Sequence, residues 1–323
     1  MGPSTSKLVT VFGGSGFVGR YLVRNLAKSG WRVRVAVRRP DLVGHLQPMG
    51  AVGQIQPVFA DVRDMGTVSA AVSHADAVVN LVGILAEGGK QTFTSVQAEG
   101  AANIAKAAKD AGTGRLVHFS AIGADPESAS AYARSKAEGE AAVREARPDA
   151  IILRPSIVFG PEDAFFNRFA RMAKLSPILP VVGPDTRFQP VYVGDLGGFA
   201  AAAVEGSVAT GSTYELGGPD IETFRSLMQQ MLAITNQKRR LVELSFGVAA
   251  FQARMMSVLP KAPLTEDQVE LLKHDNVVSD EAVMEGRTFQ AAGMMPHSLA
   301  SILPTYLWVY RRHGQFAQPG GAA

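Results

Sequence analysis

The chain has no cysteine among its 323 residues, which excludes disulfide bonds, thiolate metal sites and a cysteine nucleophile. Its six histidines never stand three or four residues apart, so the sequence predicts no metal site. It also lacks any apolar run of about 18 residues, the length at which a membrane-spanning helix is expected. Because the first strand pattern begins near Lys7, we expect no signal or transit peptide.

Acidic residues are missing from the first 40 positions, which carry eight lysines and arginines. The whole chain has a net charge of only +3, and no basic stretch alternates with aromatic residues as a nucleic-acid surface requires. We therefore expect no nucleic-acid partner. The hydrophobic content of 46% is enough for one large domain or two unequal ones.

Three glycines, Gly13, Gly16 and Gly19, stand between a short apolar strand at 8–12 and an amphipathic helix at about 17–28. In such a unit the first glycine makes a tight turn, the second lets the backbone approach a pyrophosphate, and the third lets helix and strand pack closely. The amides at the start of the helix then face the anion. The pattern predicts a dinucleotide site; a tight turn without a ligand is the alternative.

The strand at 31–37 ends in Arg38 and Arg39. A site for NAD usually carries an acidic residue here, about 20 positions after the glycines. An arginine instead suits the 2′-phosphate of NADP through charge-assisted hydrogen bonds. The sequence therefore favours NADP(H) over NAD(H); two solvated arginines at a strand end are the alternative.

Helical and strand patterns alternate as far as about residue 154, which predicts an α/β fold with a doubly wound parallel sheet. Ligands of such sheets bind beyond the carboxyl ends of the strands. We predict that six strand ends meet in one crevice, within a dinucleotide-binding domain spanning 1–160. The residues at these ends are Gly13, Arg38, Asp61, Gly83, Ser120 and Pro155.

The alternation loosens after Gly160, and helical patterns dominate 221–300. We predict a smaller, mainly helical lobe over 161–314, with a strand near 188–193 that returns to the edge of the main sheet. Asp195 is expected to cap the helix that follows this strand. The tail at 315–323, rich in glycine, alanine and proline, is expected to be flexible.

Several motifs together resemble the extended short-chain dehydrogenase/reductase superfamily, in its epimerase/dehydratase branch, which implies a Rossmann fold. These motifs lie at 13–19, 61–62, 80–83, 132–136, 154–155 and 191–195. Within the superfamily, the chain is similar to the family of NADPH-binding accessory subunits of respiratory complex I and their bacterial homologues. The stretches that carry this closer resemblance are 45–50, 150–156, 159–163, 189–193 and 264–269.

The resemblance covers roughly residues 7–313 and implies both a nucleotide site and a docking site on complex I subunits. It implies a cytoplasmic protein, peripheral on the cytoplasmic face of a bacterial inner membrane, or on the matrix side if mitochondrial. The matching motifs also imply a set of cofactor-binding residues. These are Gly13, Ser15, Gly16, Phe17, Val18, Gly19, Arg38, Arg39, Asp61, Val62, Leu81, Val82, Gly83, Ser120, Tyr132, Lys136, Pro155, Ser156 and Val158.

Tyr132 and Lys136 stand at the i, i+4 spacing that places both on one face of a helix. In the superfamily such a pair exchanges a proton with the substrate during hydride transfer. The further serine or threonine expected after Ser120 is absent, because Ala121 and Ile122 have no hydroxyl. Loss of one oxyanion donor costs ~3 kcal/mol. We therefore expect Tyr132 and Lys136 to anchor the nucleotide; catalysis with Ser120 as a substitute, or a purely structural pair, are the alternatives.

Two apolar stretches, at 244–259 and 302–312, are too short to cross a bilayer but suit a membrane surface. In the second, Arg311 and Arg312 follow aromatic residues, as is typical of a headgroup boundary. Ordinary core of the smaller lobe is the alternative for both stretches.

Two functions are consistent with these features. In the first, the protein binds NADPH as a largely structural ligand and acts as an accessory or assembly subunit of the NADH:quinone oxidoreductase, complex I. In the second, it is an NADPH-dependent reductase or epimerase/dehydratase in quinone-related metabolism. The missing donor at 121–122 favours the first, and the intact pair of Tyr132 and Lys136 keeps the second open.

Overall fold

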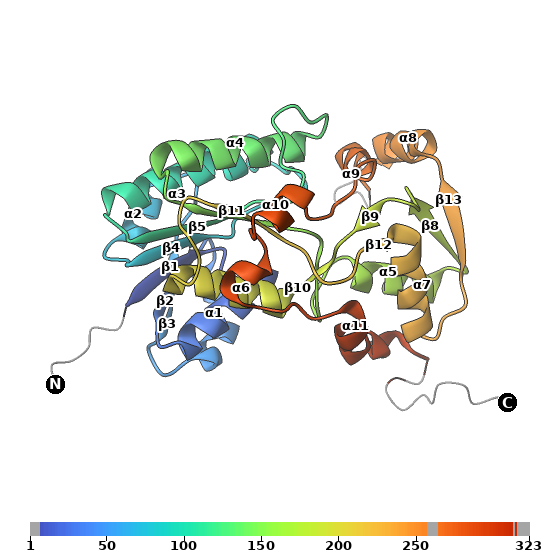
Figure 1. Cartoon of the computed structure of the whole chain (residues 1–323), viewed down its shortest axis with the longest axis horizontal. Helices are drawn as coiled ribbons and strands as arrows, with labels where there is room; N and C mark the ends of the chain where they lie inside the picture. Colours follow the sequence, from blue (N-terminus) through green and yellow to red (C-terminus); the bar gives the residue numbers. More distant parts are fainter. Residues whose placement is uncertain (1–6, 257–263, 313, 315–323) are drawn as a thin grey trace. The chain divides into compact units, whose positions relative to one another are not determined.

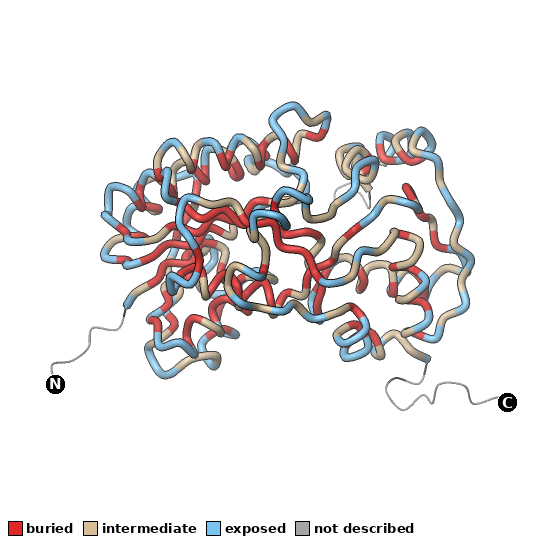
Figure 2. The backbone as a smooth tube through the Cα atoms, viewed as in Figure 1, coloured by how far each residue is buried: buried red, intermediate tan, exposed pale blue. Residues whose placement is uncertain are grey.

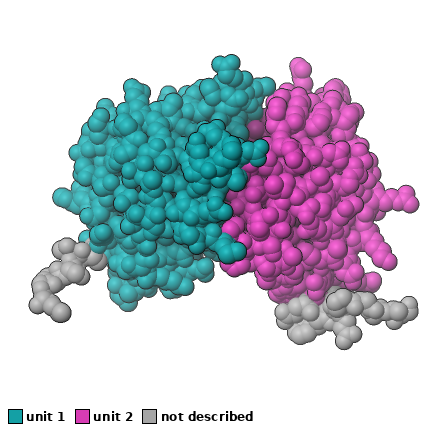
Figure 3. Space-filling model, viewed as in Figure 1, with its two compact units in different colours: residues 1–155, 193–216, 279–295 teal, residues 156–192, 217–278, 296–323 magenta. Residues whose placement is uncertain are grey.

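The computed structural model describes residues 7–256, 264–312 and 314. The tail at 315–323 and the end of the 244–259 stretch lie outside the described residues. The chain forms two compact units (Figure 3). Unit 1 comprises 1–155, 193–216 and 279–295, and unit 2 comprises 156–192, 217–278 and 296–323.

This division differs from the expected split into 1–160 and 161–314. The first boundary lies within a few residues of the expected one, but the chain returns to unit 1 twice after leaving it. The physical reason is that the first returning stretch supplies a helix and an edge strand to the main sheet, and these have more contacts there than in unit 2.

A parallel sheet of seven strands forms the centre of unit 1 (Figure 1). Across the sheet the strands are β11 (Thr213–Leu216), β6 (Ile151–Pro155), β5 (Arg115–Phe119), β4 (Ala77–Asn80), β1 (Leu8–Phe12), β2 (Arg32–Val37) and β3 (Ile55–Phe59). The order reverses between β1 and β4, which confirms the doubly wound Rossmann arrangement and adds one strand at the edge. The carboxyl ends of all these strands therefore share one edge.

Helices cover both faces of this sheet (Figure 1). On one face α1 (Phe17–Lys28) packs against α6 (Val193–Glu205), and on the other α2 (Met65–Val72), α3 (Glu99–Asp110) and α4 (Ala131–Ala146) lie side by side. Because both faces are covered, the central strands are buried along most of their length (Figure 2). Unit 1 also contains the short α10 (Asp280–Met284) and the 3-10 turns η1 (Pro40–Leu42), η2 (Gly44–Met49) and η4 (Phe289–Ala292).

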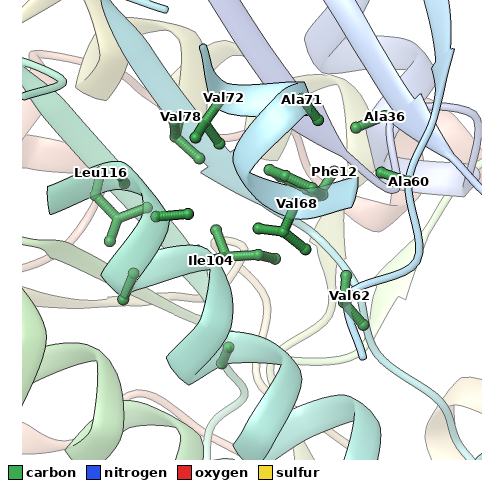
Figure 4. Close-up of a cluster of buried hydrophobic side chains, with 14 of the residues drawn as sticks. Phe12, Ala36, Ala60, Val62, Val68, Ala71, Val72, Val78, Ile104 and Leu116 are labelled. Atoms are coloured by element: carbon green, nitrogen blue, oxygen red, sulfur yellow. The ribbon is translucent and has the colours of Figure 1, made fainter. Parts of the chain in front are cut away.

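One large hydrophobic cluster joins the sheet to α2 and α3 (Figure 4). Phe12, Val78 and Leu116 from the strands meet Val68 and Ile104 from the helices, and all are fully or almost fully buried. Burying an aliphatic or aromatic side chain of this size contributes ~2 kcal/mol. This packing holds the strand ends in place, and so fixes the edge at which the site residues lie.

The described part of unit 2 contains five α-helices and three two-stranded sheets. The helices are α5 (Phe166–Leu175), α7 (Phe224–Ile234), α8 (Phe246–Met256), α9 (Glu266–Leu271) and α11 (Leu299–Leu307), the last followed by the 3-10 turn η5 (Trp308–Tyr310). The strand pairs are β7 (Val158–Phe159) with β10 (Val191–Tyr192), β9 (Arg187–Phe188) with β12 (Glu222–Thr223), and β8 (Ile178–Val182) with β13 (Arg240–Leu244). The predicted helical character is confirmed. The strand pairs were not predicted. The longest of them includes Pro180 in β8, and proline is unusual inside a strand.

Two details of the prediction are wrong. The strand near 188–193 does not reach the main sheet, because β10 pairs with β7 inside unit 2 and β11 takes the edge position beside β6. Four residues of β11 pair with β6, whereas β10 offers only two. Asp195 is not the N-cap residue: α6 begins at Val193, so Asp195 lies buried in its first turn.

Candidate functional site

The turn between β1 and α1 requires glycine at two positions. Gly13 has a left-handed backbone, with φ of +76°, and a Cβ on it would stand 3.3 Å from the backbone carbon of Leu81. A Cβ on Gly19 would stand 2.5 Å from the Gly13 carbonyl oxygen and 2.6 Å from the backbone of Gly14. These glycines hold α1 against the end of β1, which is the geometry of a pyrophosphate-binding turn.

The first turn of α1 presents backbone amides without a competing side chain. Gly16 is the N-cap residue, no side chain caps the helix, and no acidic residue lies in its first turn. The neighbouring Ser15, Phe17 and Val18 are half-buried. The helix N-terminus therefore offers amide donors and a positive dipole end to an anion.

The segment after β4 lies directly against this turn. Leu81 donates its amide to the Phe12 carbonyl at 3.0 Å, and Val82 donates its amide to the Asn80 side-chain oxygen, also at 3.0 Å. Asn80 is 2% exposed, so this hydrogen bond is protected from water. Asn80 therefore fixes the path of the segment that ends at Gly83.

His118 on β5 supports Asn80 from the next strand. Its Nδ1 lies 3.1 Å from the Asn80 side-chain nitrogen. Burial, and then the charges of Lys136 and Arg144, lower the pKa of His118 to about 3, so the ring is neutral at ordinary pH. A neutral Nδ1 can accept a hydrogen bond from the Asn80 amide, which leaves the Asn80 oxygen free for Val82.

The two arginines that follow β2 differ in their surroundings. Arg39 forms a double ion pair with Asp41, with Nε 3.0 Å and NH2 2.7 Å from its carboxylate oxygens. Arg38 is exposed and has no ion pair within the described part of the chain. The end of β2 is tied to the glycine turn, because Gly13 donates its amide to the Ala36 carbonyl at 3.2 Å. Arg38 is therefore the guanidinium available to a ligand beside the turn.

Asp61 and Val62, after β3, are both held by protein contacts. The Asp61 carboxylate accepts hydrogen bonds from the Arg63 side chain, one of them from Nε at 2.9 Å. These hydrogen bonds, with a smaller contribution from the charge of Arg38, hold the pKa of Asp61 below its usual value. Val62 is buried, and a Cβ on Gly100 would stand 2.7 Å from it. The Arg63 guanidinium therefore balances the negative charge of Asp61, which reduces electrostatic repulsion of an anion bound near Arg38.

Lys136 brings its ammonium group to the end of β4 from α4. Its Nζ donates to the Phe119 carbonyl at 3.2 Å, and a Cβ on Gly83 would stand 3.2 Å from the same atom. Burial lowers the pKa of Lys136 to about 8, although Glu140 acts in the opposite direction. A lysine with this pKa can bind a ribose hydroxyl as a cation or take part in proton exchange.

Tyr132 lies on the same face of α4 as Lys136. Its ring centroid is 5.9 Å from the Lys136 Nζ, and it packs edge to face on Phe93 with centroids also 5.9 Å apart. Helix α4 begins after Ser130, whose side chain accepts the amide of Ala133 and so caps the helix. The structure therefore brings the predicted pair together at the same edge as Gly83.

Two buried polar atoms at this edge have no hydrogen-bond partner within the described residues, Ser120 Oγ and Gln97 Oε1. Gln97 Oε1 lies 3.3 Å from the place that a Cβ on Gly83 would take, next to Lys136. A buried polar atom without a partner costs ~1–3 kcal/mol, so such atoms mark where a ligand or water is expected. The glycine turn and these atoms together fit a dinucleotide, with its anion at α1 and its polar sugar groups near Lys136.

Gln97 was not predicted as a site residue. A π-helical turn, η3 (Thr94–Ala98), precedes α3 and carries Gln97. A usable signal was Gly139, because a Cβ there would stand 2.4 Å from the Gln97 carbonyl oxygen. A glycine inside a helix of strong helix formers indicates such a close approach.

The loop after β5 is tied down in a form that leaves the catalytic set incomplete. Ser120 donates its amide to Leu153 at 2.7 Å, and Ile122 donates its amide to Pro155 at 3.1 Å. Ala121 and Ile122 supply no side-chain donor. Moving Ser120 into the missing position would break both hydrogen bonds, each worth ~1 kcal/mol.

The last predicted cofactor residues fall at the boundary between the units. Pro155 ends β6 and the first stretch of unit 1, whereas Ser156 and Val158 belong to unit 2. Ser156 donates to Asn276, with its Oγ 2.6 Å from Oδ1, and Val158 pairs with Val191. Both are occupied within unit 2, and their part in cofactor binding stays a prediction.

Metal and membrane features were also sought over residues 7–256, 264–312 and 314. In that part of the chain, no three His, Cys, Asp or Glu side chains come together as metal ligands. None of its helices combines the length and the apolar character needed to cross a membrane.

Comparison with known proteins identifies the family. Residues 13–163 match a family model described as NAD(P)H-binding. Over 321 residues the chain is 36% identical to the mitochondrial NADH dehydrogenase (ubiquinone) 1 alpha subcomplex subunit 9 of Arabidopsis thaliana, covering 95% of this chain and 79% of that protein. The chain belongs to the alpha subcomplex subunit 9 family. This confirms the expected family, and the strand order of the central sheet agrees with its Rossmann fold.

Two further similar proteins are named as enzymes. The ceramide reductase of Caulobacter vibrioides is 32% identical over 241 residues, which cover 73% of each protein. An NADPH-dependent quinone oxidoreductase from Escherichia coli, solved with NADPH, superposes with a TM-score of 0.72 over 91% of this chain and 97% of that one. Its sequence identity is 19%, so this likeness concerns the fold alone.

Proposed function

We propose that this member of the alpha subcomplex subunit 9 family is an NADP(H)-binding accessory or assembly subunit of the NADH:quinone oxidoreductase, complex I, in which the nucleotide is largely structural. The observation that carries the proposal is the 36% identity to a subunit of that enzyme over 95% of the chain. The features of the crevice in unit 1 support the part that concerns the nucleotide.

The preference for NADP(H) over NAD(H) rests on Arg38. An exposed guanidinium without an ion pair can form charge-assisted hydrogen bonds to a 2′-phosphate, whereas Arg39 is already taken up by Asp41. The pairing of Asp61 with Arg63 reduces repulsion of a phosphate at the neighbouring strand end. NADP(H) supplies hydride chemistry wherever an enzyme uses it; here Arg38, the glycine turn and Lys136 would bind and orient it.

A structural role for the nucleotide is consistent with the unpartnered atoms. Ser120 Oγ and Gln97 Oε1 are buried without partners, so a ligand that satisfies them stabilises the fold. A ligand present at 100 times its Kd adds ~2.7 kcal/mol to the free energy of unfolding. The absence of a donor at 121–122 removes the main reason to expect turnover.

The location follows from the same proposal: the cytoplasmic face of a bacterial inner membrane, or the matrix side in mitochondria. Of the two apolar stretches, α8 presents Val248, Phe251 and Met255 on one exposed face, with exposures of 47%, 67% and 66%. In the other stretch, Leu303 and Leu307 are fully buried in the core of unit 2. Helix α8 is therefore the better candidate for an apolar contact with other subunits of complex I.

A tagged pull-down from gently solubilised membranes tests the proposal. We expect NADH:quinone activity to co-elute, and NADP(H) to be released from the eluate on denaturation in amounts close to one per chain. An Arg38→Glu variant serves as the matched control for the nucleotide. A clean protein with neither activity nor nucleotide would contradict both parts of the proposal.

The second candidate is an NADPH-dependent reductase or epimerase/dehydratase. It is favoured by Lys136, whose pKa of about 8 suits proton exchange beside Tyr132, and by the family likeness to a ceramide reductase. It predicts a cofactor that exchanges freely and consumption of NADPH with a carbonyl substrate. Loss of that activity in Tyr132→Phe, with nucleotide binding unchanged, would support this candidate over the first.

A further inference from the structure

Unit 2 gathers positive charge at one end from three stretches of chain that contain no acidic residue, 164–184, 224–242 and 296–312. Hydrogen bonds join these stretches. Arg239 Nε donates to the Ala173 carbonyl at 2.6 Å, Gln237 Nε2 to the Tyr310 carbonyl at 3.1 Å, and Arg311 Nε to the Ile234 carbonyl at 2.7 Å. The Lys174 ammonium also lies 5.9 Å from the Tyr310 ring.

We call this region the basic end; its cations are Arg171, Lys174, Lys238, Arg239, Arg240, Arg311 and Arg312. Among the described residues, none of these side chains forms an ion pair. By contrast, Arg187 and Arg225 in the same unit are paired with Asp275 and Glu243. The charge of the basic end is therefore not balanced by the chain itself.

A groove with a volume of about 770 Å³ opens at the basic end. Lys238, Arg239 and Arg240 line it together with the apolar Pro177, Ile178 and Leu232. Arg239 is half-buried, and its NH1 donates only to the Lys238 carbonyl. The groove thus combines cations with an apolar floor.

Exposed apolar side chains stand between the cations. Leu175 is 85% exposed, Ile178 48% and Val309 47%. Ile178 stands opposite Arg240 in the β8–β13 ladder, so the two side chains share one face of that pair of strands. Basic and apolar groups mixed in this way fit the boundary of a bilayer, where phosphates lie above acyl chains.

We propose that the basic end binds the surface of a bilayer containing anionic phospholipids. The cations contact headgroup phosphates, and Leu175, Ile178 and Val309 enter the layer below them. The inference deepens the proposed function, because it names the part of the chain that meets the membrane and the lipid class it selects. It does not require α8 or the nucleotide.

Nucleic acid is the other polyanion that a basic surface can bind, and the aromatic side chains argue against it. Trp308 donates its Nε1 to Thr305, and Tyr310 donates its hydroxyl to Asn167 at 2.9 Å. Both rings are half-buried, so neither offers the free stacking face that single-stranded nucleic acid uses.

Vesicle co-sedimentation of the full-length protein tests the proposal. We expect binding to vesicles of phosphatidylcholine mixed with phosphatidylglycerol, little binding to phosphatidylcholine alone, and release by salt. Each cation near an anionic surface adds about fivefold to binding, so Lys238→Gln with Arg240→Gln should weaken it about 25-fold. The matched control is Lys106→Gln with Lys109→Gln on α3, which removes two exposed cations from unit 1.

Equal weakening in the two double variants would show a net-charge effect and overturn the proposal, as would equal binding to both kinds of vesicle. A single-stranded oligonucleotide that binds more tightly than the vesicles, and loses binding in Lys238→Gln with Arg240→Gln, would overturn it in favour of nucleic acid. Leu175→Ser should also weaken vesicle binding, whereas Leu85→Ser, at a leucine of unit 1 that is 67% exposed, should not. Bound NADP(H) and co-purifying complex I activity are measured on the same samples, so a failure of the proposed function is seen separately.

Discussion

The two sides of the candidate nucleotide site in unit 1 are built by different means. On the side of β1, β2 and β4, binding groups are mainly backbone amides, positioned by Gly13 and Gly19 and by the Asn80 hydrogen bond to Val82. On the side of β5 and α4, the candidate groups are side chains, and there the donor at 121–122 is missing while Lys136 remains. The difference indicates that nucleotide binding and catalysis can be separated, because backbone geometry survives substitutions that remove a catalytic side chain.

On the side of β1, β2 and β4, we expect the largest loss of stability and of nucleotide binding from a substitution at Gly19. In Gly19→Ala the new Cβ meets backbone atoms at 2.5–2.6 Å, and we expect a loss of about 3 kcal/mol in unfolding free energy together with loss of bound nucleotide. Urea unfolding and nucleotide release measure both effects. Gly247→Ala is the matched control, because Gly247 is also helical but faces open space, and it should be neutral or stabilising by up to about 1 kcal/mol.

His118 links the two sides, and its effect depends on pH. Its pKa is about 3 in the folded protein against 6.5 for the free side chain, so below pH 6.5 the unfolded chain binds a proton that the folded one does not. Stability should therefore fall as pH falls from 6.5 toward 3, by up to about 1.4 kcal/mol per pH unit from this group. His118→Gln should show a shallower loss in urea unfolding across that range, and parallel pH curves would contradict the assignment.

A substitution at Arg38 tests whether the site prefers NADPH to NADH. Arg38→Glu should weaken NADPH binding roughly 100-fold through loss of charge-assisted hydrogen bonds and added repulsion, and leave NADH binding within about threefold. Isothermal titration with both nucleotides measures the ratio. Arg39→Glu should have a smaller effect, because Arg39 is paired with Asp41; an unchanged ratio in Arg38→Glu would remove the 2′-phosphate assignment.

On the side of β5 and α4, restoring the missing hydroxyl should have the smallest effect on activity. If the protein is an accessory subunit, Ile122→Ser should restore a hydroxyl without producing NADPH consumption on any carbonyl substrate. A stopped or continuous assay of NADPH absorbance measures this, with Tyr132→Phe added to Ile122→Ser as the negative control. Appearance of activity that depends on Tyr132 would mean a weakened enzyme rather than a structural subunit.

The sequence predicted most of unit 1, because β1 to β6 are short apolar runs separated by helical patterns. It did not predict β11, whose Glu215 interrupts the apolar pattern. That carboxylate is tolerated inside the fold because it accepts the Ser279 amide at 2.8 Å and lies 3.7 Å from Arg154. Both partners come from distant parts of the chain, so no local pattern reveals them.

The positions of the candidate site residues in the fold were predicted to a similar degree, and their binding roles stay a prediction. Glycines and strand ends carry local signals, so Gly13, Arg38 and Lys136 could be named in advance. Gln97 could not, since its place depends on a π-helical turn pressed against Gly139. Of the basic end, only Arg311 and Arg312 were singled out by the sequence, because the other cations lie in stretches that only folding brings beside them.

The division of unit 1 into three stretches has a consequence for the order of synthesis. Every strand end of the candidate nucleotide site has been synthesised once residue 155 is added, but α6 and β11 follow only after residues 156–192. Until then α1 lacks the helix that packs on it so closely that a Cβ on Gly197 would stand 2.9 Å from Tyr21, and β6 is an open edge. The growing chain therefore passes through a stage in which a nearly complete nucleotide site carries exposed apolar surface, and early capture of the nucleotide or a chaperone would protect it there.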